Sequence, residues 1–383
     1  MHGWRRSAPG WRRSAKTWSA STALAATLVL TGTPAPAASA AAVSCPAIGS
    51  GDSNGLDMQY WQLSPDGLVC EAEFTTGALY TPRGPGAPQI DPVRRPVRVR
   101  VELPEGYDPS AAYPVLYLLN GGAADYEQWT SGGGNVTDSV TKAGFKGIVV
   151  MPEGGRVGFY SDWQGATYGN FAPLWETFHI KQLVPWIDAH FATSGRRAVA
   201  GMSMGGYGAL KYAAQRPDLF SAVGAFSGGT DIRRPDHQQI VNEGTTLYGA
   251  RFWRHGSGSD AGNYWKYLFP GNPGALQRTE LVFGPQSGWT AFNPAQVAGS
   301  RPDAYRSYQG KLALYAGRNE DPYTWNNELH ATLKQQSVPH RYCSGPGGHD
   351  FSTWTPALEH FLRFAFGATS TPCPDTTGWR QEP

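Results

Sequence analysis

The stretch Arg196-Arg-Ala-Val-Ala-Gly-Met-Ser-Met-Gly-Gly-Tyr-Gly-Ala-Leu210 decides the fold. A short apolar run leads into a glycine-rich turn around Ser203, and the small residues that follow can continue as a helix from 205 to 215. Glycine permits both the tight turn and the close approach of a helix to its strand. A strand, a turn and a helix in this order are typical of a nucleophile elbow, which raises a serine hydroxyl above a sheet. The stretch therefore predicts Ser203 as the nucleophile of an acyl-transfer enzyme.

The pattern Gly-x-Ser-x-Gly occurs a second time, in Gly51-Asp-Ser-Asn-Gly55. Ser53 lies in a polar, glycine-rich run, with no apolar strand before it and no helical pattern after it. Because a nucleophile elbow needs both, we interpret this second match as a chance occurrence in a chain that contains 48 glycines.

Apolar runs alternate with helical patterns from about residue 95 onward. The expected strands cover residues 97–103, 114–119, 147–151, 198–200, 220–226, 311–316 and 340–343, and the expected helices cover 174–191, 205–215, 325–336 and 356–366. The first of these strands alternates apolar and charged residues, which predicts a half-exposed antiparallel strand. The alternation as a whole predicts an α/β fold with a mostly parallel, doubly wound sheet and helices on both faces. The site of such a sheet lies beyond the carboxyl ends of its strands.

The composition divides the chain into four regions. A basic segment, an apolar core and Ala38-Ser-Ala40 predict that residues 1–40 are a signal peptide for Sec or Tat export. Residues 41–92 are expected to form an irregular or hairpin extension, residues 93–367 the catalytic domain, and residues 368–383 a C-terminal tail. Within the catalytic domain, residues 231–310 are an aromatic-rich insertion that is expected either to roof the active site or to cover a sheet edge.

The charge of the chain is concentrated in the predicted signal peptide. Its removal takes away five positive charges and changes the formal net charge from +2 to −3. The basic isoelectric point therefore does not support nucleic-acid binding. The apolar core of residues 20–30 is too short to span a bilayer, and no other segment is a candidate.

The chain contains four cysteines, Cys45, Cys70, Cys343 and Cys373. None of them forms a C-x-x-C pair, so the sequence does not suggest a zinc site. Disulfides are expected in an exported protein. Of the three pairings we favour Cys45–Cys70 with Cys343–Cys373, because pairs that are close in sequence would fasten each end of the domain.

A serine nucleophile needs a base and an orienting acid, and both are expected late in the chain. His349 lies in the glycine-rich segment Gly345-Pro-Gly-Gly-His-Asp-Phe351, directly after the last strand. The acid should follow the strand 311–316, where Glu320 has the preferred spacing. Asp321 and, in the next helix, Glu328 remain alternatives.

Backbone N–H groups are needed to stabilise the tetrahedral intermediate. The first is expected at Met204, the residue after the nucleophile. The second is expected at Gly122 or Gly121, in the loop that follows the strand 114–119. The sequence implies no metal ion and no organic cofactor.

With these residues placed, the chain resembles the esterase branch of the α/β-hydrolases over about residues 95–367. This branch contains esterase D (S-formylglutathione hydrolase), bacterial feruloyl and acetyl esterases, and the secreted mycolyltransferases. The similarity rests on residues 113–122, 150–155, 159–163, 175–178, 200–209, 283–284, 293–294 and 347–351.

The resemblance implies that Ser203 and His349 are the nucleophile and the base, and that Met204 and Gly122 are the oxyanion donors. Feruloyl esterases place the acid where Glu320 stands, whereas mycolyltransferases use a helix glutamate, which would suggest Glu328. The expected function is that of a secreted ester hydrolase acting on a small-molecule, glycan or lipid ester. The alternatives are an acyltransferase to a sugar or glycerolipid alcohol, and an inactive binding module. The oligomeric state does not follow from the sequence.

Overall fold

A computed structural model describes residues 44–49, 52–79, 96–164, 173–248, 275–367 and 372–383. The predicted signal peptide and residues 249–274 of the predicted insertion lie outside the described residues. The same holds for Trp253, Tyr264, Trp265, Tyr267 and Phe269, which gave that insertion much of its aromatic character.

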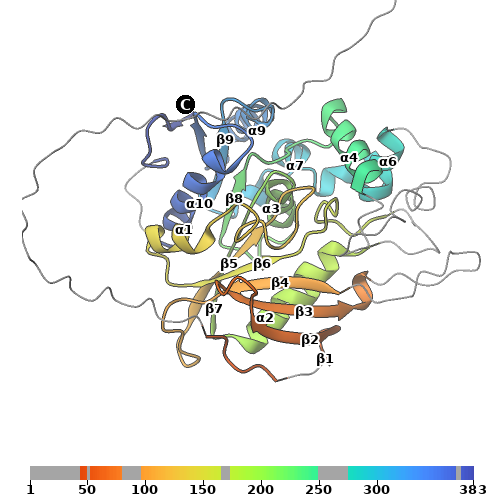
Figure 1. Ribbon diagram of the computed structural model, residues 1–383. Helices are drawn as coiled ribbons and strands as arrows, with labels where there is room; N and C mark the ends of the chain where they lie inside the picture. The colour runs from red at the N-terminus through yellow and green to blue at the C-terminus, as the bar shows by residue number, and fades with distance from the viewer. Residues whose placement is uncertain (1–43, 50–51, 80–95, 165–172, 249–274, 368–371) are drawn as a thin grey trace, which may run out of the picture. The chain divides into compact units, whose positions relative to one another are not determined.

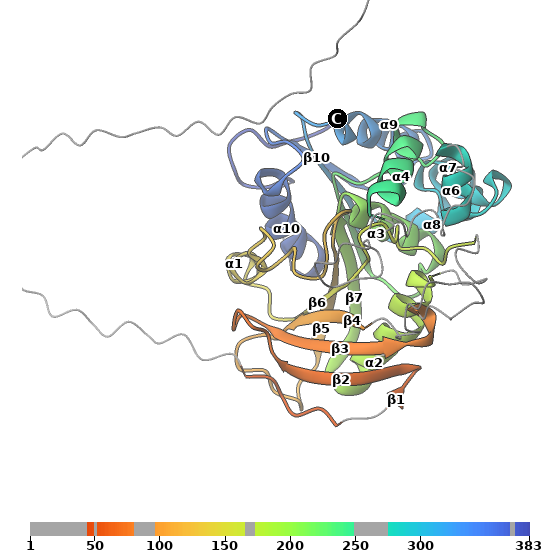
Figure 2. The same cartoon turned by 45° about the vertical axis from the view of Figure 1, so that its right-hand side comes forward.

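The described strands form one sheet of eleven strands, in the order β1-β2-β3-β4-β6-β5-β7-β8-β9-β10-β11. Six neighbouring strands of this order run parallel, namely β6, β5, β7, β8, β9 and β10. Antiparallel strands flank them on both sides. The strands are β1 (Asp52–Ser53), β2 (Leu56–Leu63), β3 (Cys70–Thr76), β4 (Val97–Glu102), β5 (Tyr113–Leu119), β6 (Ile148–Pro152), β7 (Thr193–Met202), β8 (Ala222–Phe226), β9 (Leu312–Gly317), β10 (Arg341–Gly345) and β11 (Arg380–Gln381). Figures 1 and 2 show the orange strands β2 to β4 at one end of the sheet and the blue C-terminal segments at the other.

Helices occupy most of the connections between the strands. They are α1 (Val136–Ala143), α2 (Val184–His190), α3 (Met204–Gln215), α4 (Pro235–Tyr248), α6 (Ala275–Phe283), α7 (Pro294–Ser300), α8 (Asp303–Arg306), α9 (Pro322–Gln335) and α10 (Phe351–Phe366). The π-helix η3 (Thr177–Leu183) leads into α2, and the 3-10 helices are η1 (Gly77–Leu79) and η4 (Gln286–Ala291).

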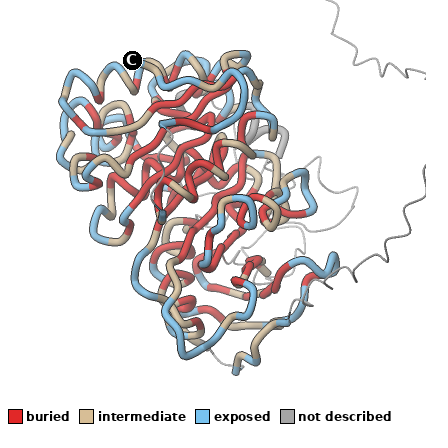
Figure 3. The backbone as a smooth tube through the Cα atoms, turned by 90° about the vertical axis from the view of Figure 1, so that its left-hand side faces the viewer, coloured by how far each residue is buried: buried red, intermediate tan, exposed pale blue. Residues whose placement is uncertain are grey.

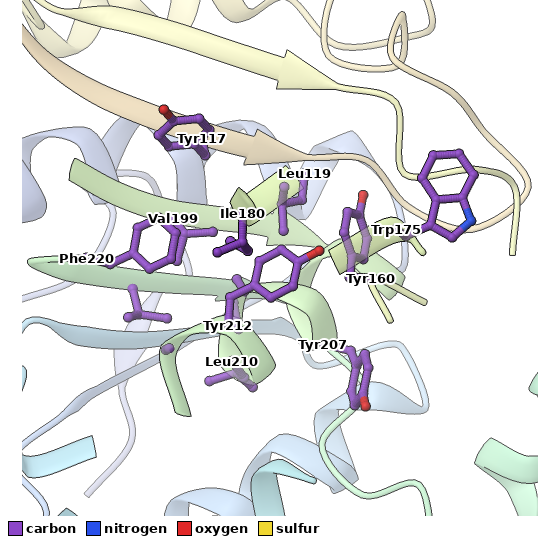
Figure 4. Close-up of a cluster of buried hydrophobic side chains, with 14 of the residues drawn as sticks. Tyr117, Leu119, Tyr160, Trp175, Ile180, Val199, Tyr207, Leu210, Tyr212 and Phe220 are labelled. Carbon is purple, nitrogen blue, oxygen red and sulfur yellow. The ribbon is translucent and has the colours of Figure 1, made fainter. Parts of the chain in front are cut away.

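Each face of the sheet carries its own hydrophobic core. Along β5, Val115, Tyr117 and Leu119 enter one core, whereas Leu116 and Leu118 enter the other. Helices α2, α3 and α9 pack against the first core, and α1 and α10 pack against the second. Figure 3 shows that buried residues run along the central strands, and Figure 4 shows part of the first core. The predicted α/β-hydrolase architecture, with helices on both faces of a mostly parallel sheet, is confirmed.

The prediction that residues 97–103 form a half-exposed strand is wrong in one respect. The strand β4 is antiparallel, as expected, but it lies between β3 and β6, and its charged side chains Arg100 and Glu102 are buried. The alternation of apolar and charged residues marks one apolar face and one largely buried polar face here. Carboxylates from neighbouring segments pair with Arg100, whereas Arg98 on the same face stays 31 % exposed. Pattern alone cannot distinguish a solvated charge from a buried and paired one.

The last helix begins five residues earlier than the sequence suggested, at Phe351 instead of Pro356. Asp350 caps it, because its side chain accepts a hydrogen bond from the Ser352 N–H at 2.8 Å. Pro356 lies inside the helix, where it removes one backbone donor without ending the helix. The early start places the helix terminus directly beside His349.

Each segment that flanks the parallel strands contains a disulfide: one fastens residue 45 to β3 within the N-terminal segment, and the other joins the C-terminal tail to β10. Disulfides link Cys45 to Cys70 and Cys343 to Cys373, the two pairings that the sequence favoured. Within the predicted extension, residues 52–79 supply the antiparallel strands β1 to β3, and within the predicted tail β11 pairs with β10. Among the described helices, none combines the length and the apolar character needed to cross a bilayer.

Candidate active site

The turn between β7 and α3 holds Ser203 in a strained conformation. Its backbone has φ 53° and ψ −116°, values that residues other than glycine rarely adopt. The Ser203 N–H donates to the carbonyl of Phe226 at 2.8 Å, which ties the turn to the neighbouring strand β8. Strain of this kind persists only where the surrounding structure enforces it. The turn therefore has the geometry expected of a nucleophile elbow.

Two glycines allow the elbow to pack this tightly. A Cβ atom on Gly205 would lie 2.5 Å from the carbonyl oxygen of Leu119. A Cβ atom on Gly201 would lie 2.6 Å from the backbone of Gly205. Because real Cβ atoms do not approach backbone atoms so closely, larger residues at these positions would push helix α3 away from the sheet.

A chain of hydrogen bonds connects Ser203 to a buried carboxylate. The Nε2 atom of His349 lies 2.9 Å from the Oγ of Ser203, and its Nδ1 atom lies 2.6 Å from Oε2 of Glu320. The carboxylate accepts the hydrogen of Nδ1, which leaves Nε2 free to accept the proton of the serine hydroxyl. The structure thus brings together three residues that the sequence placed on three separate loops.

The structure places the two alternative acids elsewhere. Glu328 is half exposed and pairs with Nη1 of Arg234 at 2.6 Å. Asp321 occupies the N-cap position of α9, where its side chain makes no capping hydrogen bond. Glu320, of the three candidates, is the one that contacts His349.

The Glu320 side chain is only 1 % exposed and is held from two directions. Its Oε1 atom accepts a hydrogen bond from the hydroxyl of Ser227 at 2.6 Å and from the N–H of Gly317 at 2.7 Å. The Ser227 hydroxyl in turn accepts from the indole N–H of Trp354 at 3.0 Å. These contacts leave Oε2 directed at His349.

Ser227 and Trp354 were not identified from the sequence. Ser227 directly follows the strand 220–226 and precedes two glycines, so its place at the carboxyl edge could have identified it. Trp354 offered no such indication, because it lies in a helix that was expected to begin after it.

The imidazole of His349 is accessible, since its side chain is 40 % exposed. Two hydrogen bonds hold its loop in place. Thr353 Oγ1 donates to the carbonyl of Gly348 at 2.7 Å, and the Asn319 N–H donates to the carbonyl of Gly347 at 3.2 Å. The His349 ring also meets the indole of Trp354 edge-on, at 5.1 Å between centroids. A fixed backbone and an open face suit a group that must exchange protons with a bound molecule.

The loop after β5 contains one backbone donor that lies beside the elbow. The N–H of Gly121 already donates to Oε1 of Gln128, and that of Ala123 to the carbonyl of Arg156, both at 2.7 Å. Among the described residues, no side-chain or backbone oxygen accepts a hydrogen bond from the Gly122 N–H. Gly122 also lies beside the elbow, because a Cβ atom on it would be 3.8 Å from Cβ of Met204. The geometry therefore favours Gly122 over Gly121 as the second oxyanion donor.

A cavity of about 670 Å³ opens over Ser203. Its lining comes from several loops and from the predicted insertion, which contributes His237 and Ile240 of α4. The other lining residues are Gly122, Ala123, Arg156, Val157, Phe159, Ser203, Met204, Tyr207, Ser227, Gly229, Asn319, Glu320, Asp321, Pro322, Trp325 and His349. The described part of the insertion thus walls the cavity, and Trp289 of the same segment is fully buried in the first core.

Ser53, the serine of the second motif, lies in strand β1 at the far edge of the sheet. Its hydroxyl accepts a hydrogen bond from Asn54 at 3.1 Å. In the part of the chain that the structure describes, no three or more His, Cys, Asp or Glu side chains are grouped to hold a metal ion.

Comparison with known proteins agrees with this geometry. Residues 92–365 match the family model described as "Putative esterase". The chain is 34 % identical over 280 residues to Esterase Rv1288 of Mycobacterium tuberculosis, covering 66 % of this chain and 52 % of that protein. It is 33 % identical over 151 residues to the diacylglycerol acyltransferase/mycolyltransferase Ag85B of Mycobacterium leprae, covering 37 % and 44 %. The chain spans about half the length of the curated relatives it matches.

Solved structures share the fold. A ferulic acid esterase aligns with a TM-score of 0.50 at 23 % identity, covering 71 % of this chain and 93 % of its own. An S-formylglutathione hydrolase from Agrobacterium tumefaciens aligns with a TM-score of 0.52 at 12 % identity, covering 80 % and 98 %. Since the family model covers most of the chain and these folds agree with its sheet, the chain belongs to the esterase family of the α/β-hydrolases.

Proposed function

We propose that this chain is an exported, serine-dependent carboxylic ester hydrolase that acts through an acyl-enzyme. The observation that carries the proposal is the hydrogen-bond chain from Glu320 through His349 to Ser203, which ends in an open cavity. Membership of the esterase family supports the same reaction class.

In the first half of the reaction, Ser203 Oγ attacks the ester carbonyl carbon while His349 Nε2 takes the hydroxyl proton. The carbonyl oxygen becomes an oxyanion, which the N–H groups of Met204 and Gly122 stabilise. The bond from the carbonyl carbon to the alcohol oxygen then breaks, and His349 returns the proton to the leaving alcohol. The acyl group remains as an ester of Ser203.

In the second half, a water molecule attacks this ester and His349 takes one of its protons. The tetrahedral intermediate collapses, the carboxylic acid leaves, and the proton returns to Ser203 Oγ. Throughout the cycle, Glu320 holds the imidazole in one tautomer and stabilises its protonated form.

A second function, acyl transfer to an alcohol, is favoured by the similarity to the mycolyltransferase of M. leprae. Hydrolysis and transfer share the acyl-enzyme and differ only in the acceptor that resolves it. Turnover of p-nitrophenyl butyrate with and without trehalose or glycerol separates them. Both reactions release p-nitrophenol, but a transferase forms acylated trehalose or glycerol, whereas a hydrolase gives butyrate as the only acyl product in both mixtures.

Export is part of the proposal because residues 1–40 have the composition of a signal peptide and the chain forms two disulfides. Secretion of the expressed chain, followed by mass spectrometry of its N-terminus, tests this part. A mature start near residue 41 is expected, and a chain retained inside the cell with Met1 intact would contradict it.

Comparing ester turnover by the wild type and by Ser203→Ala tests the catalytic part. The variant should lose about 10⁴-fold or more in kcat, because no other group supplies the nucleophile. Ser53→Ala is the matched control, since it removes the serine of the second motif, and it should retain full activity. Equal turnover by the wild type and Ser203→Ala would refute the mechanism.

A further inference from the structure

His237 lies in the cavity over Ser203 but outside the hydrogen-bond chain of the proposed reaction. It sits in the first turn of α4 and is 4 % exposed. Its Cε1–Nε2 edge faces Gly229, another lining residue, because a Cβ atom on Gly229 would lie 2.6 Å from Cε1 and 2.9 Å from Nε2. A buried imidazole on a cavity wall needs an explanation, since polar groups are costly to bury.

The hydrogen bonds of His237 determine its tautomer. Its Nδ1 atom lies 3.1 Å from the backbone carbonyl of Asp231. A carbonyl oxygen can only accept, so Nδ1 carries the hydrogen and, in the neutral ring, Nε2 is an acceptor. Among the described residues, Nε2 has no hydrogen-bond partner. The cavity wall therefore presents an acceptor that no described residue uses.

Aromatic neighbours hold the ring in this orientation. The indole of Trp325 stacks on it, at 5.8 Å between centroids and 9° between planes, and Tyr207 meets it edge-on at 6.0 Å. Trp325 is itself fixed by the hydrogen bond from its Nε1 atom to Asp236 at 3.1 Å. Turning the ring over would break the contact with Asp231, so Nε2 stays on the cavity side.

The ring is also neutral under ordinary conditions. Burial lowers the pKa of His237, although the carbonyl and the charge of Asp231 act in the opposite direction. The charged groups nearby are largely occupied with one another, since Asp231 pairs with Arg233, and Arg234 pairs with Asp236 and Glu328. A neutral ring offers a lone pair at Nε2.

From this arrangement we infer that His237 is a specificity-determining residue, which accepts a hydrogen bond from a hydroxyl group of the ester substrate. The inference rests on the proposed esterase function and adds the class of substrate, namely esters that carry a hydroxyl group within reach of His237. An ester that lacks the hydroxyl leaves Nε2 without a partner after water has been displaced, and this lowers its kcat/KM.

Two pairs of esters test the inference, each pair differing in hydroxyl content. Vinyl 3-(4-hydroxyphenyl)propanoate and vinyl 3-phenylpropanoate place the difference in the acyl group. Glyceryl monobutyrate and propyl butyrate place it in the alcohol. The wild type should prefer the hydroxylated ester of at least one pair by about tenfold in kcat/KM, the value of one neutral hydrogen bond.

Substitutions at His237 identify the source of that preference. His237→Asn keeps a donor near the Nδ1 position and leaves no acceptor at the Nε2 position, so the preference should fall to about one. His237→Gln places an amide oxygen near the Nε2 position and should restore part of the preference. His190→Asn is the matched control, because Nδ1 of His190 also bonds a backbone carbonyl, that of Trp186 at 2.8 Å. The His190→Asn variant should show the same preference for hydroxylated esters as the wild type.

Two results would overturn the inference. One is a wild type that shows no preference in either pair, and the other is a preference that survives in a folded His237→Asn. Both are distinct from failure of the proposed function, in which the wild type would hydrolyse none of the four esters.

Discussion

Two regions of this molecule bury charged side chains, and they do so in different ways. In the antiparallel part of the sheet, the Arg100 cluster consists of Arg100, Glu71, Asp66 and Glu127. The guanidinium of Arg100 is 1 % exposed and pairs with the three carboxylates at 2.7 to 3.1 Å. At the carboxyl edge of the parallel strands, Glu320 is equally buried, but its hydrogen bonds lead through His349 to an accessible hydroxyl.

The difference lies in where each hydrogen-bond network ends. In the Arg100 cluster protein groups meet the guanidinium on every side, with Thr130 and Ser131 completing its hydrogen bonds. The network at Glu320 stays open at one end, where a substrate can enter. Removing one partner from a closed network of buried charges destabilises the fold, whereas an open network is available for proton transfer. Substitutions in the two regions should therefore affect different quantities.

The largest expected effect is on catalysis, at Glu320. Glu320→Gln should lower kcat by about 10⁴-fold, because the amide can no longer stabilise the imidazolium or hold the correct tautomer. Steady-state kinetics with a p-nitrophenyl ester measure the loss. Glu328→Gln is the matched control and should change kcat by less than about twofold, since Glu328 only pairs with Arg234 at the surface. The reverse result would make Glu328 the acid.

The next effect is on stability, at Arg100. Arg100→Met should lower the free energy of unfolding by about 3–5 kcal/mol, because it leaves the buried carboxylate of Glu71 without its counter-charge. Urea denaturation measures the change. Arg216→Met, which breaks the exposed pair with Asp218, should cost no more than about 0.5 kcal/mol. A small change in the free energy of unfolding, or a loss of activity in the folded Arg100→Met variant, would contradict the proposal that the two regions have different roles.

A third prediction concerns Glu102, the buried carboxyl group at the end of β4. Burial raises its pKa to about 7, against an opposing hydrogen bond from Thr137. The folded protein therefore binds this proton more tightly than the unfolded chain does, so stability falls as the pH rises from about 4.5 to about 7. Glu102→Gln cannot ionise, and at about pH 8 it should be more stable than the wild type by about 2 kcal/mol.

This advantage of Glu102→Gln should shrink toward zero near about pH 4, where the carboxyl is neutral in both states. Thermal or urea unfolding at a series of pH values gives the two curves. Parallel curves for the wild type and the variant would mean that Glu102 does not titrate as described. Esterase activity per folded molecule should be the same in both proteins.

The smallest predicted effect is at Ser227, the residue that supports Glu320 from the side away from His349. Ser227→Ala removes the 2.6 Å hydrogen bond to Oε1 and should lower kcat by about tenfold, with KM nearly unchanged. Ser221→Ala is the control, because its hydroxyl bonds only the carbonyl of Arg197 at the surface. A kcat that does not respond to Ser227→Ala would show that the Gly317 N–H is enough to hold the carboxylate.

The sequence predicted the elements whose determinants are local. A nucleophile elbow depends on glycines within a few residues of Ser203, so both the turn and its orientation followed from one short segment. The place of His349 followed from strand order, because the carboxyl ends of parallel strands share one edge of the sheet. The two disulfides were predicted because the cysteines of each pair are close in sequence.

The remaining features depend on contacts between distant segments. Glu320, Asp321 and Glu328 all carry a carboxylate, and the choice among them depends on how Ser227 and Gly317 hold one of the three. The burial of Arg100 depends on Glu127, which lies in a loop beyond the next strand along the chain. Alternation within a strand shows which residues share a face, but it does not show what covers each face. The prediction that the charged face of β4 is open to solvent was therefore wrong at Arg100 and Glu102.

The central claim is that Ser203 is the activated nucleophile at the open end of the hydrogen-bond chain. Treating the folded protein with a fluorophosphonate and mapping the adduct by peptide mass spectrometry tests this most directly. One phosphonyl group per chain is expected on the peptide that contains Ser203, with no labelling of folded Ser203→Ala and slow labelling of His349→Ala. A folded wild type that does not react, or that carries its adduct on another residue, would contradict the claim.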